Sequence, residues 1–267
     1  MIRCGLTCGL VVGLLTGCTK LDRFIEIGEP YHHVVITNIS DVTIDPVHIY
    51  IEGDGRPFLN KNTVASDPTP RRTLVLNLMR SDPAGGIYIG RPCYFGMAKL
   101  SECSDRLWTG SRYSTEIIDS MAVVTKRLAK GRSIVLIGHS GGGAIALLMA
   151  KRLPKVVALV TLSGNLDLTA WARHHGYTPL IDSEDPALQL PIPPHVRQLH
   201  AVAGRDEVVP AHIIRGLANR LPSHSICSLP EFDHTCCWAD GWARFIRVVD
   251  ERLRSEKRSL QAACQQF

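Results

Sequence analysis

The sequence predicts an α/β fold in which a mostly parallel central sheet is flanked by helices. Short apolar runs of strand length alternate with one-sided helical patterns from about residue 34 to residue 254. The central run, Ile134–Ile137, is apolar at every position, as expected for a strand that is covered on both faces. The 267 residues suit one large domain or two small ones, and no long linker divides the pattern.

The elements follow one another in a regular order. Strands are expected at residues 34–36, 47–51, 86–89, 133–137, 156–163, 198–203 and 225–229. Helices are expected at residues 69–79, 114–129, 142–153, 211–221 and 238–254. The proline-rich stretch 166–195 has little periodicity, and it is predicted to be an irregular insertion crossing the sheet edge where ligands bind. A plain surface loop is the alternative.

Composition excludes several classes of protein. The apolar fraction of 45% is too high, and the charged fraction of 21% too low, for a disordered chain. The chain has no run of about 18 apolar residues, which a membrane-spanning helix would need. The formal charge of +5 is mild and the basic residues are scattered, so we expect no nucleic acid as a partner.

The first residues have the order of a secretory signal. Arg3 precedes a short apolar stretch that ends in Leu15-Thr16-Gly17-Cys18, which resembles the lipobox of bacterial lipoproteins. The resemblance implies a signal peptide over residues 1–17, a lipid anchor on Cys18 and a tether over residues 18–30. Thr19, in place of Asp, favours the outer membrane of a bacterial envelope, facing the periplasm. An ordinary signal peptide with a chance cysteine is the alternative.

Beyond Cys18 an even number of cysteines remains, which suggests disulfides in an exported chain, although fifteen pairings are open. The ten-residue spacing of Cys93 and Cys103 makes them the first expected pair. Cys227 with Cys236 or Cys237 is the next, and free, inert thiols are the alternative. The chain has no C-x-x-C, and adjacent cysteines do not easily ligate one ion, so we expect no metal and no cofactor. The six are Cys93, Cys103, Cys227, Cys236, Cys237 and Cys264.

The stretch 138–142, Gly-His-Ser-Gly-Gly, fits G-x-S-x-G. It follows an apolar strand and precedes a helical pattern, which is the setting of a nucleophile elbow. Ser140 would sit on a tight, strained turn, and side chains at Gly138 and Gly142 would collide there. The helix that follows would direct its N-terminal amides at an oxyanion. A glycine-rich turn without chemistry is the alternative.

With this motif the chain resembles the α/β-hydrolase superfamily over most of residues 31–255. It is also similar to a group of bacterial exported α/β hydrolases of poorly defined substrate. The resemblance implies an α/β-hydrolase domain over residues 31–258, a C-terminal tail over residues 259–267, and a catalytic triad in the order Ser, acid, His. The stretches that carry the closer resemblance are 50–55, 67–70, 90–93, 108–109, 112–114 and 163–167.

In that order both partners of the serine lie beyond Ser140. Asp206 follows the predicted strand 198–203, where the superfamily carries its acid, and Val208-Val209-Pro210 favours it over the neighbouring Glu207. His234 lies in the loop past the last strand, where it can reach both partners. His212 and His224 are weaker candidates for the base, because they fall within or at the end of a predicted helix. His175 is expected at most to line the site.

The oxyanion hole needs two backbone N–H donors. Gly141 is expected to supply one. Asp54 is the candidate for the other, with Gly53 allowing the backbone to turn after strand 47–51. Lipases and esterases often have His-Gly at this loop, so the acidic Asp54 departs from the pattern. Its carboxylate would disfavour an oxyanion unless it points away.

Two function classes follow. The first is a serine hydrolase that cleaves a small-molecule ester, thioester or amide through an acyl-enzyme, with carboxylic esters leading by analogy. The second is a catalytically decayed lipoprotein of the same fold that serves as a binding or scaffolding module. The sequence does not identify the acyl group, the alcohol or the oligomeric state.

Overall fold

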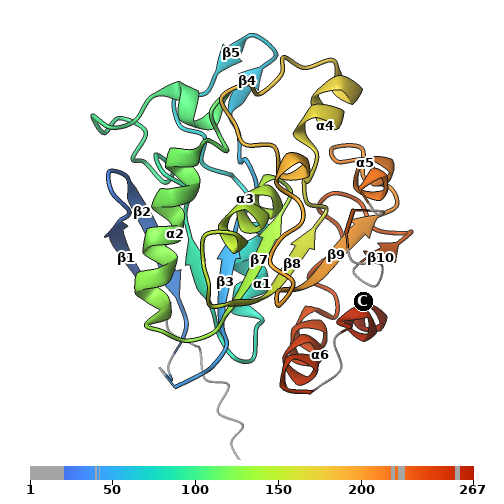
Figure 1. Cartoon of the computed structure of the whole chain (residues 1–267). Helices are drawn as coiled ribbons and strands as arrows, with labels where there is room; N and C mark the ends of the chain where they lie inside the picture. The colour runs from blue at the N-terminus through green and yellow to red at the C-terminus, as the bar shows by residue number, and fades with distance from the viewer. Residues whose placement is uncertain (1–20, 40, 42, 218–219, 222–225, 256–258) are drawn as a thin grey trace, which may run out of the picture.

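A computed structural model describes residues 21–267 except 40, 42, 218–219, 222–225 and 256–258. Within this part a sheet of eight strands has the order β1-β2-β6-β3-β7-β8-β9-β10 (Figure 1). The strands β6, β3 and β7 to β10 are parallel, whereas β2 is antiparallel to β1 and β6. The predicted mostly parallel sheet is therefore confirmed. Its strands are β1 Asp22–Ile27, β2 His32–Thr37, β3 Val47–Ile51, β6 Ile87–Ile89, β7 Ile134–His139, β8 Val156–Leu162, β9 Arg197–Ala203 and β10 Ile226–Leu229.

Helices form a layer on each face of the sheet. Residues of α2 (Thr115–Ala129), α3 (Gly141–Ala150), α4 (Leu168–His175) and α5 (Ala211–Gly216) belong to one hydrophobic core. Residues of α1 (Leu74–Arg80) and α6 (Trp242–Arg254) belong to the other. Along β3, Ile49 and Ile51 face the first core and Tyr50 faces the second. Because side chains alternate between the faces, a strand between two layers is apolar throughout.

The chain leaves β3 and β7, two neighbouring strands, in opposite directions. From β3 it continues to β6 on one side, and from β7 it continues to β8 on the other. Ile51 pairs with Gly138, so the loop after β3 lies beside the turn after β7. This carboxyl edge, at the point where the strand order reverses, is where open α/β sheets bind ligands.

The two ends of the described chain differ from expectation. The stretch 18–30, expected to be a tether, contains the edge strand β1, whose side chains are mostly exposed and so give little apolar signal. The expected tail, 259–267, contains the 3-10 turn η3 (Gln261–Gln266), which packs on α6 and β10. The predicted signal peptide, 1–17, and Cys18 lie outside the described residues.

Several helix boundaries also differ from those predicted. α1 begins at Leu74 rather than at residue 69, because the Thr69 hydroxyl bonds Asp67 and accepts the Phe95 amide instead of capping a helix. α6 begins only at Trp242, after Gly241 in a left-handed conformation (φ 78°). The region 166–195 is not wholly irregular, since it carries α4 and the 3-10 turn η2 (Pro186–Gln189). A small hairpin of β4 (Phe58–Asn60) and β5 (Thr63–Val64) precedes α1.

Three disulfides join the six cysteines beyond Cys18. Cys93 bonds Cys103, as predicted. Cys227 bonds Cys264, and Cys236 bonds Cys237, so the predicted pairing of Cys227 with Cys236 or Cys237 is wrong. The reason is that η3 packs beside β10 and brings Cys264 to the buried Cys227. Among the described residues, no helix combines the length and the apolar character needed to cross a membrane.

Candidate active site

Ser140 occupies a strained turn between β7 and α3. Its backbone has φ 54° and ψ −124°, which a non-glycine residue rarely adopts. A Cβ on Gly138 would lie 2.2 Å from the Gly142 carbonyl oxygen, and one on Gly142 would lie 2.2 Å from the Ile51 carbonyl oxygen. Both positions therefore require glycine. The Ser140 amide donates to the Leu162 carbonyl (3.0 Å), which fixes the turn against β8. This is the geometry of a nucleophile elbow.

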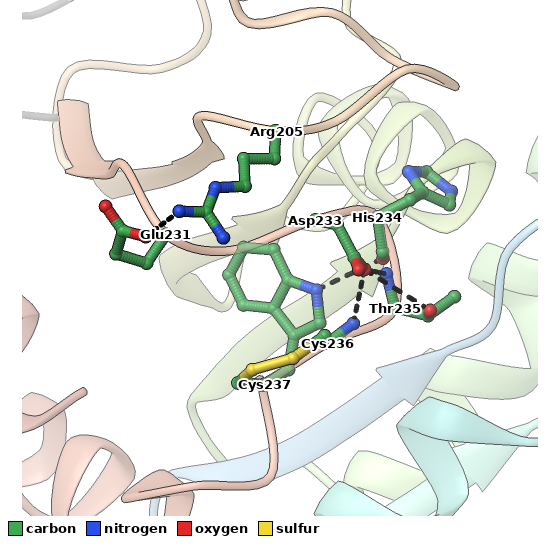
Figure 2. The surroundings of a disulfide bond; sticks show 8 residues. Arg205, Glu231, Asp233, His234, Thr235, Cys236 and Cys237 are labelled. Atoms are coloured by element: carbon green, nitrogen blue, oxygen red, sulfur yellow. Dashed lines mark hydrogen bonds and ion pairs between the residues drawn. A yellow bond between two sulfur atoms is a disulfide. The ribbon is translucent and has the colours of Figure 1, made fainter.

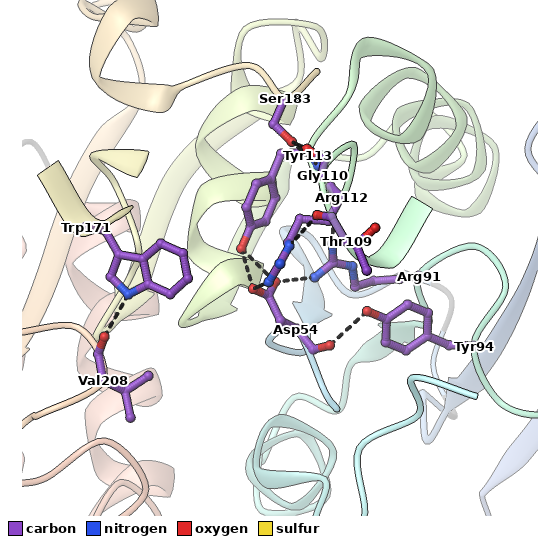
Figure 3. Close-up of polar contacts among 10 residues, drawn as sticks. All are labelled: Asp54, Arg91, Tyr94, Thr109, Gly110, Arg112, Tyr113, Trp171, Ser183 and Val208. Atoms are coloured by element: carbon purple, nitrogen blue, oxygen red, sulfur yellow. Dashed lines mark hydrogen bonds and ion pairs between the residues drawn. The ribbon is translucent and has the colours of Figure 1, made fainter. Parts of the chain in front are cut away.

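A large cavity of about 1390 Å³ opens over Ser140. Its walls come from the loop after β3, the β4–β5 hairpin, the segment before α1, the chain around Arg112, α4 with the residues that follow it, and the loop of His234. Part of the lining is apolar, including Trp171, Leu180 and Val208. Figure 3 shows Trp171 and Val208 on one side of this region, joined by a bond from the indole N–H to the Val208 carbonyl (2.8 Å).

Asp206 lies just past the end of β9, and its side chain is fully buried. The carboxylate accepts the amides of Val208 and Val209 (2.8 Å each) and the Nδ1–H of His234 (2.8 Å). Burial raises the pKa of Asp206, but the His234 hydrogen bond and charge outweigh it, so the pKa is lowered. The neighbouring candidate Glu207 is exposed instead.

Asp233, the other acid close to His234, is used differently. It accepts the amides of Thr235 (2.7 Å) and Cys236 (2.6 Å), as Figure 2 shows beside the Cys236–Cys237 disulfide. The structure therefore pairs the His234 ring with Asp206. It holds the His234 backbone as well, because the His234 carbonyl accepts from the Trp238 indole N–H (3.1 Å).

His139 is a second clamp on the His234 loop, and sequence reasoning missed this role. Its Nε2 lies 2.7 Å from the His234 carbonyl oxygen, and the two ring centroids are 4.6 Å apart. Burial and the neighbouring His234 lower the pKa of His139 to about 3, so the ring is neutral at pH 7 and donates this bond. The only signal in the sequence is its place inside the elbow.

The structure brings Ser140 and His234 to one cavity, with Asp206 behind the histidine. In the described part of the chain no hydrogen bond joins the Ser140 hydroxyl to the His234 ring. Catalytic hydrogen bonds often tighten only when substrate is bound. His175 lines the cavity as expected. His212 instead lies near His174 on α4, with ring centroids 4.9 Å apart, and His224 lies outside the described residues.

The loop after β3 lies against the elbow. A Cβ on Gly53 would lie 3.2 Å from the Ser140 Cβ, and one on Gly141 would lie 2.0 Å from Asp54 Oδ1. Among the turn and loop hydrogen bonds of the described residues, none uses the amide of Asp54 or Gly141 as donor. The predicted oxyanion donors are therefore adjacent to Ser140.

The Asp54 side chain is held in a buried group of residues that we call the oxyanion-loop cluster: Asp54, Arg91, Arg112 and Tyr113 (Figure 3). Asp54 accepts from Arg91 Nη1 (2.6 Å), Arg112 Nη1 (2.9 Å) and the Tyr113 hydroxyl (2.6 Å). Burial alone would raise the pKa of Asp54, but the two guanidinium groups have the larger effect. The pKa is therefore well below its usual value, and the carboxylate stays ionised. Its charge is thereby neutralised, which removes the conflict expected between Asp54 and an oxyanion.

Glu52, directly before Gly53, is a buried carboxylate beneath the same loop. It accepts the Val75 amide at the start of α1 at 3.2 Å. Burial raises the pKa of Glu52 to about 7, although backbone N–H groups partly oppose this. Among the described residues, no group of three or more His, Cys, Asp and Glu side chains is placed to hold a metal ion.

Comparisons with known proteins agree with this fold. A family model described as the alpha/beta hydrolase fold matches residues 101–190. No curated protein matches the chain significantly. A putative hydrolase from Agrobacterium vitis superposes with a TM-score of 0.61 and 14% identity, over 88% of this chain and 100% of that one.

Two further solved structures are similar. A proline iminopeptidase-related protein from Thermus thermophilus has a TM-score of 0.62 and 14% identity, over 92% of this chain and 98% of that one. The esterase domain of a Rhodothermus marinus protein has a TM-score of 0.57 and 17% identity, over 88% and 98%. At such identities the likeness concerns the fold. The protein therefore has the α/β-hydrolase fold.

Proposed function

We propose that the protein is a serine hydrolase that cleaves carboxylic esters through an acyl-enzyme. The observation that carries this proposal is the strained Ser140 at the floor of a cavity shared with the bonded His234–Asp206 pair. Esters lead over thioesters and amides by analogy with the esterase domain of similar fold, and fold alone does not fix the substrate.

In the proposed mechanism, the His234 Nε2 takes the proton of the Ser140 hydroxyl as the oxygen attacks the ester carbonyl carbon. The Nδ1–H bond to Asp206 holds the tautomer that leaves Nε2 free to act as base, and it stabilises the imidazolium. His234 then gives the proton to the departing alcohol. Water, deprotonated by the same ring, attacks the acyl carbon and releases the acid and Ser140.

The oxyanion of each tetrahedral intermediate would be stabilised by the amides of Gly141 and Asp54. The oxyanion-loop cluster supports this role in two ways. It neutralises the carboxylate beside Gly141, and it fixes the Asp54 peptide, whose carbonyl accepts the Tyr94 hydroxyl (2.8 Å). Preorganised donors of this kind account for much of the rate of acyl-transfer enzymes.

A fluorophosphonate probe tests the proposal, because it phosphonylates only an activated serine. We expect the purified wild-type protein to be labelled, and Ser140→Ala to lose all labelling. Ser101→Ala, which removes an exposed serine outside the cavity, is the matched control and should label like the wild type. Absence of labelling in the folded wild-type protein would reject the hydrolase and favour the binding or scaffolding module.

We further propose that the protein is anchored to the bacterial envelope by lipid on Cys18. The lipobox-like stretch 15–18 supports this, and three disulfides suit an oxidising compartment. Wild-type protein should sediment with membranes, whereas Cys18→Ser should be soluble or remain an uncleaved precursor. Membrane association of a cleaved Cys18→Ser protein would refute the anchor.

A further inference from the structure

The charges that line the cavity are unequal. Lys61, Arg71, Arg72 and Arg112 contribute four cationic side chains, against the two carboxylates of Glu52 and Asp54. Glu52 is buried and bound to the start of α1, and Asp54 is already shared between two guanidinium groups. A concave wall of one sign raises the local concentration of ligands of the opposite sign.

Arg112 is the cavity-lining cation that also belongs to the oxyanion-loop cluster. Its side chain is only 8% exposed, and it donates through Nε to the Thr109 carbonyl (2.7 Å) and through Nη1 to Asp54 Oδ2 (2.9 Å). Within the described residues its Nη2 donates to no protein group, although the residue lines the cavity. Asp54 in turn lies against Gly141, next to Ser140. A donor of Arg112 is therefore open to a ligand close to the elbow.

The buried cluster also carries surplus charge. Two guanidinium groups, Arg91 and Arg112, share the single carboxylate of Asp54, and the Tyr113 hydroxyl stays protonated because burial raises its pKa. The cluster thus has a net charge of +1, and no other described carboxylate forms an ion pair with either guanidinium group. A buried, uncompensated charge costs free energy, and an anionic ligand group would offset that cost.

Three more cations stand at the rim. Lys61 is in the β4–β5 hairpin, and Arg71 and Arg72 are in the segment before α1. In the described structure none of the three has an ion-pair partner. All three are exposed and line the same cavity as Arg112.

We propose that the substrate is an ester carrying a negatively charged group, a carboxylate or a phosphate, which Arg112 binds while Arg71, Arg72 and Lys61 attract it at the rim. This inference rests on the proposed hydrolase function and names its substrate class. The guanidinium fork of Arg112 suits a carboxylate or phosphate. Trp171, Leu180 and Val208 offer an apolar surface for the uncharged part of the same molecule.

The test compares wild-type and variant proteins on three chromogenic esters. p-Nitrophenyl butyrate is neutral, p-nitrophenyl hydrogen glutarate carries a carboxylate on the acyl chain, and 3-carboxy-4-nitrophenyl butyrate carries one on the leaving group. Each variant is compared with the wild type on the same ester, which cancels differences in intrinsic reactivity. The two anionic esters show on which side of the scissile bond the anion binds.

For the double variant Arg71→Gln/Arg72→Gln, we expect KM for at least one anionic ester to rise roughly five-fold, with less than about a two-fold change for the neutral ester. Arg112→Lys should raise that KM about ten-fold and keep its charge beside Asp54. Arg80→Gln, on α1 but outside the cavity, is the matched control and should change nothing. Raising NaCl from about 50 to about 500 mM should raise KM for the anionic ester only.

If the double variant changes KM equally for neutral and anionic esters, or changes neither, the proposal of an anionic substrate is rejected. Turnover of the neutral ester would still support the hydrolase function in that case. Absence of turnover on all three esters together with absence of fluorophosphonate labelling would instead reject the hydrolase itself. If Arg112→Lys lowers the melting temperature, the double variant at the rim decides the question.

Discussion

The two ends of β3 each hold a buried group of charged residues, and they differ in what they face. At its carboxyl end, Asp54 and Arg112 of the oxyanion-loop cluster line the cavity that contains Ser140. At its start, His48 lies between Asp82 (2.6 Å) and Asp250 (2.9 Å), and Tyr50 donates to Asp82 (2.6 Å). We call these four residues the strand-start cluster.

We infer that the charges of the oxyanion-loop cluster serve ligand binding, whereas those of the strand-start cluster stabilise the fold. The oxyanion-loop cluster has two cations for one anion and an open donor toward the cavity. In the strand-start cluster, one cationic histidine bonds two carboxylates, one next to α1 and one on α6, so it joins the helices to the sheet. We therefore expect changes at the first end to affect turnover and changes at the second to affect stability.

The largest effect should come from the proposed catalytic residues. Ser140→Ala and His234→Ala should each lower kcat/KM by about ten-thousand-fold or more, and Asp206→Asn somewhat less. The melting temperature of Ser140→Ala should stay close to that of the wild type, because only one hydroxyl is removed. Near-normal turnover in Asp206→Asn would reject that assignment, with Glu207 and Asp233 next to test.

The opposite pattern is expected at the strand-start cluster. Asp82→Asn leaves His48 with one carboxylate and should cost about 3–5 kcal/mol of unfolding free energy. This corresponds to a fall of about 10 °C in melting temperature. The protein that remains folded at 25 °C should keep kcat/KM within about three-fold. Asp119→Asn, which removes an exposed partner of Arg152, is the control and should cost less than about 1 kcal/mol.

A smaller effect concerns pH at the strand-start cluster. Burial lowers the pKa of His48, but hydrogen bonds and charge from Asp250 and Asp82 raise it to about 10, above the ordinary 6.5. His48 therefore contributes stability that is fully present below pH 6.5 and is lost as the pH rises toward 10. The melting temperature advantage of the wild type over His48→Gln should shrink across this window. A constant advantage would mean that His48 is neutral in the folded state.

The smallest effect is expected from Glu52 beneath the oxyanion loop. Burial raises its pKa to about 7, above the ordinary 4.5, so its stabilising contribution is full below pH 4.5 and falls as the pH rises through 7. Thermal melts of wild type and Glu52→Gln should therefore diverge between pH 4.5 and 7, with the wild type losing ground. Parallel curves would show that the carboxylate does not titrate in this range.

How much of this could be predicted from the sequence depends on how local each feature is. The elbow can be predicted because the strand, the glycines and the helix all adjoin Ser140 in the sequence. Asp206 and His234 can be predicted because each follows a predicted strand, in the order that the family resemblance implies. The sheet can be predicted because its central strands are apolar throughout. The strand β1 cannot be predicted in this way, since an edge strand with exposed side chains lacks that pattern.

The oxyanion-loop cluster and the strand-start cluster could not be predicted, because their members are distant in the sequence. Asp54 meets Arg91 and Arg112 only through the fold, across 37 and 58 residues. His48 likewise meets Asp250 across 202 residues. The same holds for Cys227, whose partner Cys264 is set by the packing of η3 on β10 rather than by spacing.

The proposed mechanism requires that Ser140 form a covalent acyl-enzyme in this cavity. We would mix wild-type protein with p-nitrophenyl butyrate, quench it in acid within milliseconds to seconds, and map the modified peptide by mass spectrometry. We expect a butyryl group on Ser140, and none on any residue of Ser140→Ala. Rapid ester turnover with Ser140 unmodified at every time point, and undiminished in Ser140→Ala, would contradict it.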